Sequence, residues 1–212
     1  VMRVGDQIAE SVWLHDDLPD AEAVAARVEE VLGEVRMPDP AGAMRAFPHE
    51  LSGGMQQRVM IAMALAGRPK MLIADEPTTA LDVTIQIQVL QLLRQLKHEA
   101  GLTVPPITHD LGVAPELFDR VPVLYSRSLV ATASVAELFG NPRHPYTQGL
   151  LAALPGTSDT LAPIPGRVPD LLNPPSGCRF HPRCPLAVDR CRAEAPELRG
   201  NARQVACHEV EP

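Results

Sequence analysis

A short apolar run that ends in two acids constrains the fold of this chain more than any other feature. Met71–Ala74 reads MLIA, and Asp75 and Glu76 follow it directly. A parallel strand buried on both faces has this composition, with its polar residues emerging at its carboxyl end. Asp82 then precedes the amphipathic segment VTIQIQVLQLLRQLKHEA, which closes at Gly101 in the manner of a capped helix. A strand followed by a turn and a helix predicts an α/β fold with a parallel sheet.

Length and composition exclude several classes of protein. With 212 residues, the chain can bury one substantial core and a smaller appendage at most. No stretch approaches the roughly 20 apolar residues that a membrane-spanning helix needs. The formal net charge of −7 argues against the broad basic surface that binds nucleic acid without sequence preference.

Periodicity predicts further elements on both sides of the central strand. Residues 20–35 carry apolar residues at helical spacing, and Asp20 is a plausible N-cap. We expect a second helix over residues 55–65, a strand in LTVPPITHD and a hairpin in DRVPVLYSRSLVAT. Beyond residue 155 the chain is proline-rich and only weakly periodic until its cysteine segment.

The stretch LSGGMQQR, residues 51–58, has the composition of a turn that binds an anion. Ser52, Gly53 and Gly54 offer a hydroxyl and bare backbone N–H groups at the start of a helix, where the dipole contributes about half a positive charge. Gln56 lies close enough in sequence to join them. Taken by themselves, these residues are better explained by an ordinary serine N-cap followed by flexible glycines.

Three motifs occur in a fixed order, LSGGMQQR, then MLIADEPTTALD, then ITHD. In this order they resemble the signature, the Walker B strand with the D-loop, and the switch-histidine region of the nucleotide-binding subunit of an ABC transporter. NPRHPYTQGLLAALP and the late cysteine segment are similar to the oligopeptide/dipeptide importer branch of that family. The resemblance extends over nearly the whole chain. It implies a partial ABC-type P-loop NTPase core of α/β class, a helical signature region and a C-terminal extension rich in proline and cysteine.

The resemblance implies a role in ATP hydrolysis for each residue of these motifs. Asp75 would hold Mg²⁺, because a hard cation prefers oxygen ligands. Glu76 would orient or deprotonate the attacking water, and His109 would contact the γ-phosphate and hold Glu76 in line. Ser52, Gly53, Gly54 and Gln56 would bind nucleotide held by the opposite subunit, and Asp82 would belong to the D-loop at the dimer interface. Without the resemblance, an acidic capping turn, a surface histidine and a simple helix cap remain open alternatives.

The P-loop of the family is missing from the sequence. That motif reads G-x-x-x-x-G-K-[ST], whereas the two lysines of this chain, Lys70 and Lys97, lie in unrelated contexts. In the family, the P-loop and the Q-loop precede the segment resembling VGDQIAE. We therefore expect a fragment, or a decayed gene segment, that binds ATP weakly or not at all on its own.

Some residues depart from the family pattern. Pro105 and Pro106 stand where the family has an unbroken strand, and a proline cannot donate to a central sheet ladder. Pro115 lies in the helix expected after the switch histidine. Ser126–Ser128 replaces a turn that usually contains glycine.

The four cysteines lie close together in sequence, at gaps of five, six and fifteen residues. Disulfides require an oxidising compartment, and zinc sites usually show pairs spaced C-x₂₋₄-C, for which His181 and His208 would be alternative ligands. An iron–sulfur site held by four thiolates tolerates these gaps, and the resemblance favours a [4Fe–4S] cluster. Four reduced structural cysteines remain an alternative. The residues concerned are Cys178, Cys184, Cys191 and Cys207.

Together these observations predict an ATP-binding and ATP-hydrolysing subunit of an ABC importer for oligopeptides or dipeptides, with nickel or another small solute as other possible cargo. Expected cofactors are ATP with Mg²⁺ and the iron–sulfur cluster. Expected partners are a second ATPase subunit, two membrane permeases and, indirectly, an extracytoplasmic solute-binding protein, but no nucleic acid. The chain would be peripheral on the cytoplasmic face of the membrane. The alternatives are a non-catalytic partner subunit or remnant, and a redox- or metal-sensing module built on the cysteines.

We expect three regions along the chain. These are a helical signature subdomain at residues 1–54, the C-terminal part of the ATPase core at 55–140, and a peptide-importer-type extension at 141–212.

Overall fold

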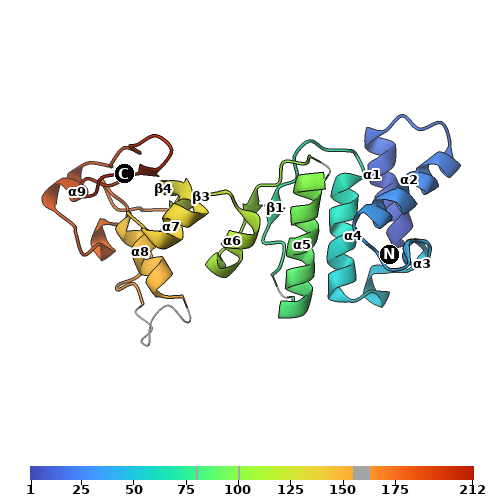
Figure 1. Cartoon of the computed structure of the whole chain (residues 1–212), viewed down its shortest axis with the longest axis horizontal. Coiled ribbons are helices and arrows are strands. Elements are labelled where there is room, and N and C mark those ends of the chain that lie inside the picture. The colour runs from blue at the N-terminus through green and yellow to red at the C-terminus, as the bar shows by residue number, and fades with distance from the viewer. Residues whose placement is uncertain (80, 100, 155–162) are drawn as a thin grey trace. The chain divides into compact units, whose positions relative to one another are not determined.

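The computed structural model describes residues 1–79, 81–99, 101–154 and 163–212 (Figure 1). They form two compact units, residues 1–109 and residues 110–212. The first unit contains, in chain order, α1 (Val4–His15), α2 (Ala21–Glu34), α3 (Pro40–Arg45), the 3₁₀ turn η1 (Pro48–Glu50), α4 (Gly53–Leu65), β1 (Ala74–Asp75), α5 (Val83–Glu99) and β2 (Pro106–Ile107). The second contains η2 (Leu111–Val113), α6 (Ala114–Leu117), β3 (Arg120–Tyr125), β4 (Ser128–Ser134), α7 (Val135–Gly140), α8 (Pro145–Ala152), η3 (His181–Arg183), α9 (Asp189–Ala193) and β5 (Gln204–Val205).

Two helices of the first unit, α2 and α5, begin where the sequence predicts N-caps. The Asp20 carboxylate accepts a hydrogen bond from the backbone N–H of Ala23 at 2.9 Å, which starts α2 at the predicted place. The Asp82 carboxylate accepts from the N–H of Ile85 at 3.0 Å at the start of α5. Helix α4 begins at Gly53, two residues before the predicted start. The apolar faces of α1, α2 and α4 are buried together and form the core of this part of the unit.

A buried arginine joins α2 to α4. The Arg27 side chain is 6% exposed, and it donates to the Leu65 carbonyl at 3.3 Å and to Glu30 and Glu34 at 2.8 and 2.7 Å. Burial lowers the pKa of Arg27, but the hydrogen bonds and charges of the two glutamates outweigh burial and raise it. The guanidinium therefore stays charged and pairs the two helices in a fixed register.

Strands β1 and β2 pair in parallel, as the sequence predicts, although each is only two residues long. Ala74 lies opposite Pro106, Asp75 lies opposite Ile107, and an isolated bridge joins Met71 to Thr103. The N–H of Ala74 donates to the carbonyl of Pro105 at 3.2 Å, but Pro105 has no N–H to return. The ladder is short because proline interrupts it.

The prediction that this strand is buried on both faces is wrong. Ala74 is 8% exposed, but the side chains of Met71 and Ile73 are 55% and 63% exposed. Side chains alternate along a strand, so Met71 and Ile73 share one face. That face is therefore largely exposed in the described part of the chain, whereas the face bearing Ala74 is packed.

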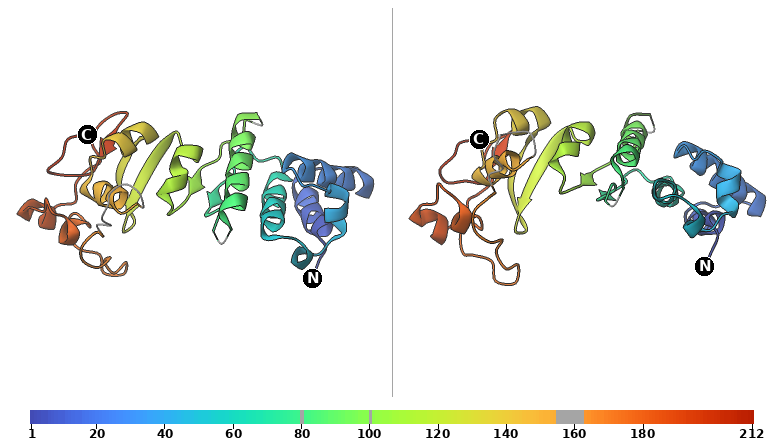
Figure 2. Two further views of the ribbon diagram at one scale, coloured as in Figure 1. Left: turned by 60° about the horizontal axis from the view of Figure 1, so that its bottom comes forward. Right: turned by 90° about the horizontal axis from the view of Figure 1, so that it is seen from below.

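The second unit is built on the predicted hairpin, which is confirmed. Strands β3 and β4 pair antiparallel, and β5 adds to β4 through Ala131 opposite Val205, so that the order is β3-β4-β5. Both views of Figure 2 show the yellow hairpin beside the red C-terminal segment that supplies β5. The connecting turn has φ of 46° at Ser126 and 64° at Arg127. Two successive residues with positive φ fit the twist of a hairpin, but each non-glycine residue there costs roughly 1–2 kcal/mol.

An aromatic cluster forms the centre of this unit. The Phe180 ring lies 5.1 Å from Tyr125 and 5.5 Å from Tyr146, both close to edge-on, and 5.9 Å from the ring of His144. Such tilted contacts are favourable because the ring edge of one residue meets the π face of another. Phe180 therefore fixes the C-terminal segment against the hairpin and α8.

The two units do not coincide with the three regions expected from sequence. The expected boundary after residue 54 lies in the first turn of α4, and the boundary after residue 140 lies within the second unit. The division into three functional regions stays a prediction. Over the described part of the chain, no helix is both long and apolar enough to cross a membrane.

His144 is a buried, neutral N-cap. Its side chain is 1% exposed, and its Nδ1 accepts a hydrogen bond from the backbone N–H of Tyr146 at 3.1 Å, which caps α8. Burial lowers the pKa of His144 to about 4, although a hydrogen bond with the Ala206 backbone opposes the shift. Protonation would remove the cap acceptor and place a charge inside the aromatic cluster.

We predict that the second unit loses stability as the pH falls from 6.5 towards 4. In this range the unfolded chain binds a proton at residue 144 and the folded chain does not, so the stability present above pH 6.5 decreases by about 3 kcal/mol in total. His144→Asn keeps a capping oxygen and should flatten this pH dependence. Urea unfolding at pH 7.5 and pH 5, followed by near-ultraviolet circular dichroism of the two tyrosines, tests this, with the exposed His98→Asn as control. An unchanged pH slope in His144→Asn would contradict it.

Candidate functional site

The parallel pairing of β1 with β2 brings two predicted catalytic side chains together. Glu76 follows β1 and His109 lies two residues beyond β2, and the Nδ1 of His109 is 2.8 Å from Oε1 of Glu76. The other carboxylate oxygen, Oε2, accepts a hydrogen bond from the Thr79 hydroxyl at 2.8 Å. His109 therefore contacts Glu76 despite the prolines at residues 105 and 106, and its switch role stays a prediction.

The backbone at Glu76 is held in an unusual conformation. Its φ is 47°, in the left-handed region that non-glycine residues avoid, and its N–H donates to the Ile107 carbonyl at 2.9 Å. Residues in such conformations cluster at active sites, where the surrounding structure imposes them. Here the ladder fixes the backbone on one side and the turn to Thr79 fixes it on the other.

Glu76 is an ionised hydrogen-bond acceptor. The hydrogen bond from Thr79 lowers its pKa most, and the hydrogen bond from His109 lowers it further. A carboxylate with a lowered pKa accepts a hydrogen bond from water readily but is a weak base. The arrangement is therefore better suited to orienting a water molecule than to removing its proton early.

Asp75 lies at the carboxyl end of β1 with its side chain exposed, next to Glu76. Among the described residues, no three Asp, Glu, His or Cys side chains converge to hold a metal ion. A magnesium ion does not need such a group, because it usually binds one or two carboxylates together with substrate phosphates and water. The exposed oxygen of Asp75 thus fits a magnesium ion that arrives with a nucleotide.

The signature turn, residues 51–54, combines a serine N-cap with exposed residues at the start of a helix. Ser52 caps α4, since its Oγ accepts from the N–H of Met55 at 3.4 Å, and Ser52 and Gly53 are exposed at the helix start. A capping serine does not exclude an anion, because the N–H groups of the first turn still point outward. Gln56 is directed elsewhere, its Nε2 donating to the carbonyls of Pro48 and Leu51 at 2.8 and 3.2 Å. It thereby fixes the turn before Ser52, and its contact with nucleotide stays a prediction.

The second glycine of the turn lets two helices approach. A Cβ atom at Gly54 would lie 2.6 Å from Cγ2 of Ile85, which lies in the first turn of α5. A Cβ at Gly53 would have only an ordinary contact, 3.6 Å from Leu81. The N-termini of α4 and α5 therefore lie side by side, and Asp82, which caps α5, is adjacent to the signature turn.

The four cysteines gather in the second unit and none is in a disulfide. Cys191 and Cys207 are buried, and Cys178 and Cys184 are half-buried. Burial raises the pKa of both half-buried thiols, and the charge that neighbouring cysteines carry as thiolates raises it further. Backbone hydrogen bonds from Phe180 and His181 to Cys178, and from Leu186 to Cys184, act in the opposite direction and favour the thiolates.

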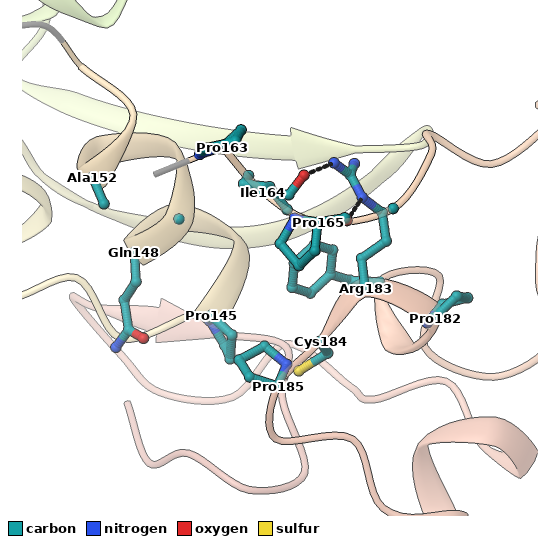
Figure 3. Close-up of a pocket in the computed structure, with 13 residues that line it drawn as sticks. Pro145, Gln148, Ala152, Pro163, Ile164, Pro165, Pro182, Arg183, Cys184 and Pro185 are labelled. Atoms are coloured by element: carbon teal, nitrogen blue, oxygen red, sulfur yellow. Dashed lines mark hydrogen bonds between the residues drawn. The ribbon is translucent and has the colours of Figure 1, made fainter. Parts of the chain in front are cut away.

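Cys184 also lines a cavity of about 560 Å³ between α8 and the C-terminal segment (Figure 3). Most of its wall is proline and other apolar groups. Arg183 closes one side and donates to the carbonyls of Pro165 and Ile164 at 2.8 and 3.0 Å. The polar groups of the wall are thus largely occupied by backbone partners.

Comparison with known protein families gives one match in the N-terminal part of the chain and another in the C-terminal part. Residues 3–79 match the ABC transporter family, and residues 130–191 match the family described as oligopeptide/dipeptide transporter, C-terminal region. The dipeptide transport ATP-binding protein DppD of Escherichia coli is 48% identical over 210 residues, covering 97% of this chain and 64% of DppD. DppD of Shigella flexneri gives the same values. The chain therefore spans 64% of the length of these relatives.

Solved structures confirm the predicted fold class. The ATP-binding cassette MJ0796, a dimer in a post-hydrolysis state bound to ADP and Pi, is 30% identical with a TM-score of 0.55, over 64% of this chain and 57% of that one. CbiO1 of Clostridium perfringens, part of the ABC transporter complex cbiONQ, is 28% identical with a TM-score of 0.58, over 66% and 54%.

One residue of the site, Thr79, and one role, the packing of Gly54, were not predicted from the sequence. Thr79 lies inside the quoted motif, and its spacing of three residues after Glu76 is the only signal that its hydroxyl reaches back. The packing role of Gly54 has no local signal, because it depends on where α5 crosses α4.

We predict that the two glycines of the signature turn differ in their tolerance of a methyl group. Gly54→Ala should destabilise the first unit by about 1–3 kcal/mol, because the new Cβ collides with the Cγ2 methyl group of Ile85. Gly53→Ala, the matched control, should be neutral or slightly stabilising, since alanine favours a helix. Urea unfolding of the two variants measures the difference, and equal stabilities would refute the close approach of α4 and α5.

Proposed function

The chain belongs to the ABC transporter family, in its oligopeptide/dipeptide importer branch, and from this premise we propose that it is the ATP-binding and ATP-hydrolysing subunit of an importer for oligopeptides or dipeptides. The observation that carries the proposal is the contact between Glu76 and His109 at the carboxyl end of β1, beside Asp75. The names of the relatives, which are dipeptide transport proteins, support the cargo.

The reaction is an in-line attack of water on the γ-phosphate of ATP. Asp75 would hold Mg²⁺, and the bound ion would supply positive charge that stabilises the phosphates. Glu76 orients the attacking water with a lone pair that its two donors leave available, and His109 holds Glu76 while contacting the γ-phosphate. Positioning of this kind is most of the catalysis in phosphoryl transfer, because the transition state is loose and requires little proton movement.

The signature turn acts on a nucleotide bound to a second subunit. Ser52 and Gly53 are exposed at the start of α4, and together with the backbone of the buried Gly54 they would offer a hydroxyl and N–H groups to the phosphates. Gln56, which fixes the preceding turn, would join them. The adjacent start of α5, with Asp82, belongs to the same dimer interface. These 212 residues contain no P-loop lysine, so the cradle for the phosphates comes from outside them.

The assembly implied by this role has a second ATPase subunit, two transmembrane permeases and an indirectly coupled solute-binding protein. The chain would lie on the cytoplasmic face of the membrane, bound to the permeases. No described feature and no comparison favours a non-catalytic remnant or a sensor built on the cysteines, and we propose neither.

We also propose that Cys178, Cys184, Cys191 and Cys207 hold a [4Fe–4S] cluster. Support comes from the gathering of four free thiols and from the backbone N–H groups directed at two of the sulfurs, since such hydrogen bonds tune iron–sulfur sites. A single zinc ion would need its ligands to converge at about 2.3 Å, and no described group does so. The four thiolates of a [4Fe–4S] cluster each bind a different iron of one cubane, so they surround a larger group than a single zinc ion. Anaerobic reconstitution with iron and sulfide should give a visible charge-transfer band, and uptake of zinc without iron would overturn the assignment.

Glu76→Gln tests the hydrolytic role directly. In the complete gene product, assembled with its partners, this change should lower ATP turnover by roughly a hundredfold or more. The amide replaces one acceptor oxygen by an NH₂ donor, so it cannot accept from both Thr79 and His109 while orienting water. Affinity for Mg²⁺–ATP should be unchanged. Glu29→Gln, on the exposed face of α2, is the control and should retain turnover. Undiminished turnover in Glu76→Gln would overturn the role given to Glu76.

A further inference from the structure

The Glu76 carboxylate is held at each of its oxygens by a different element. His109, from beyond β2, contacts Oε1, and Thr79, from the turn after β1, donates to Oε2, both at 2.8 Å. The side chains of Glu76 and His109 are 44% and 75% exposed. An exposed glutamate normally samples several rotamers and carboxylate orientations. With donors on both oxygens, neither rotation of the carboxylate nor a change of rotamer is free.

Thr79 is itself positioned by the backbone. Its N–H donates to the Glu76 carbonyl at 3.2 Å, which closes a tight turn. The left-handed conformation of Glu76, at φ 47°, turns the chain back so that a side chain three residues later can reach the carboxylate. The strained conformation and the hydroxyl contact therefore belong to one local structure.

The neighbouring threonine provides a contrast. Thr78 precedes Thr79 in the same motif and is half-buried, whereas Thr79 is exposed. Within the part of the chain that the structure describes, the Thr78 hydroxyl has no hydrogen-bond partner, whereas the Thr79 hydroxyl donates to Glu76. Its carbonyl accepts from the N–H of Leu81 at 3.3 Å, a bond that does not depend on its side chain. Of this pair, only Thr79 directs its hydroxyl at Glu76.

We propose that Thr79 is a positioning residue for ATP hydrolysis, whose hydroxyl fixes the plane of the Glu76 carboxylate opposite His109. The inference rests on the proposed function, in which Glu76 orients the attacking water. With both donors in place, each carboxylate oxygen keeps one lone-pair direction for water. Without Thr79, the carboxylate can rotate about its last bond while still contacting His109, so that the water loses a fixed acceptor.

The test compares three variants of the complete gene product in its assembly. Thr79→Val, which replaces the hydroxyl by a methyl group of similar volume, should lower kcat about tenfold, as expected for loss of one hydrogen bond to a charged group. KM for ATP should stay within about twofold, because Thr79 does not contact the nucleotide in this account. Thr79→Ser restores the hydroxyl and should restore kcat. Thr78→Val should leave both constants unchanged.

Glu76→Gln, assayed in parallel, separates the two levels of the account. If Glu76→Gln is inactive but Thr79→Val turns over normally, the positioning role is wrong and the proposed function stands. If Glu76→Gln turns over normally, the proposed role of Glu76 fails first. A Thr79→Val variant that raises KM without lowering kcat, or a Thr79→Ser variant as slow as Thr79→Val, would also overturn the positioning role.

Discussion

The parallel pairing of β1 with β2 is the constraint on which the rest of the site depends. Backbone hydrogen bonds between residues 70–76 and 103–107 set the register that places His109 against Glu76. The carboxyl ends of parallel strands meet at one edge of a sheet. The side chains of Glu76 and His109, 33 residues apart in sequence, therefore lie within hydrogen-bond distance of each other. Pro105, directly before β2, removes one donor from this ladder, but its carbonyl and the N–H of Glu76 keep the register.

A second close approach connects this edge to the signature turn. Because Gly54 has no side chain, the start of α4 lies against Ile85 near the start of α5, and α5 follows directly from the turn that carries Thr79. The helix pair α4 and α5 thus connects two groups of residues. One group is proposed to act on the chain's own nucleotide, and the other on the nucleotide of its partner. The exposed Ser52 and Gly53 then face outward, as a site for a ligand held elsewhere requires.

Local features of the sequence predicted most of the elements, and tertiary features account for what it missed. The caps at Asp20 and Asp82, the hairpin and the order strand–acid–helix are encoded within a few residues, so a single sequence reveals them. Other features depend on which distant segments pack nearby. They are the exposure of Met71 and Ile73, the lack of space for a methyl group at Gly54 and the burial of His144. The contact of Glu76 with His109 followed only from the family resemblance, because a lone histidine after a proline-broken strand has no local signal.

The central claim is that the signature turn binds a nucleotide held by another subunit, and ATP-dependent association measures it most directly. The chain is mixed with an ATP-binding subunit that carries a P-loop and cannot hydrolyse ATP, and the complex is followed by sedimentation with and without Mg²⁺–ATP. Gly53 has space for a side chain, so Gly53→Asp adds a negative charge against the phosphates without disturbing the fold, and Gly53→Ala is its neutral control. The account predicts ATP-dependent association that Gly53→Ala retains and Gly53→Asp weakens at least about tenfold, equivalent to about 1.4 kcal/mol. Equal association of the two variants, or association independent of ATP, would contradict it.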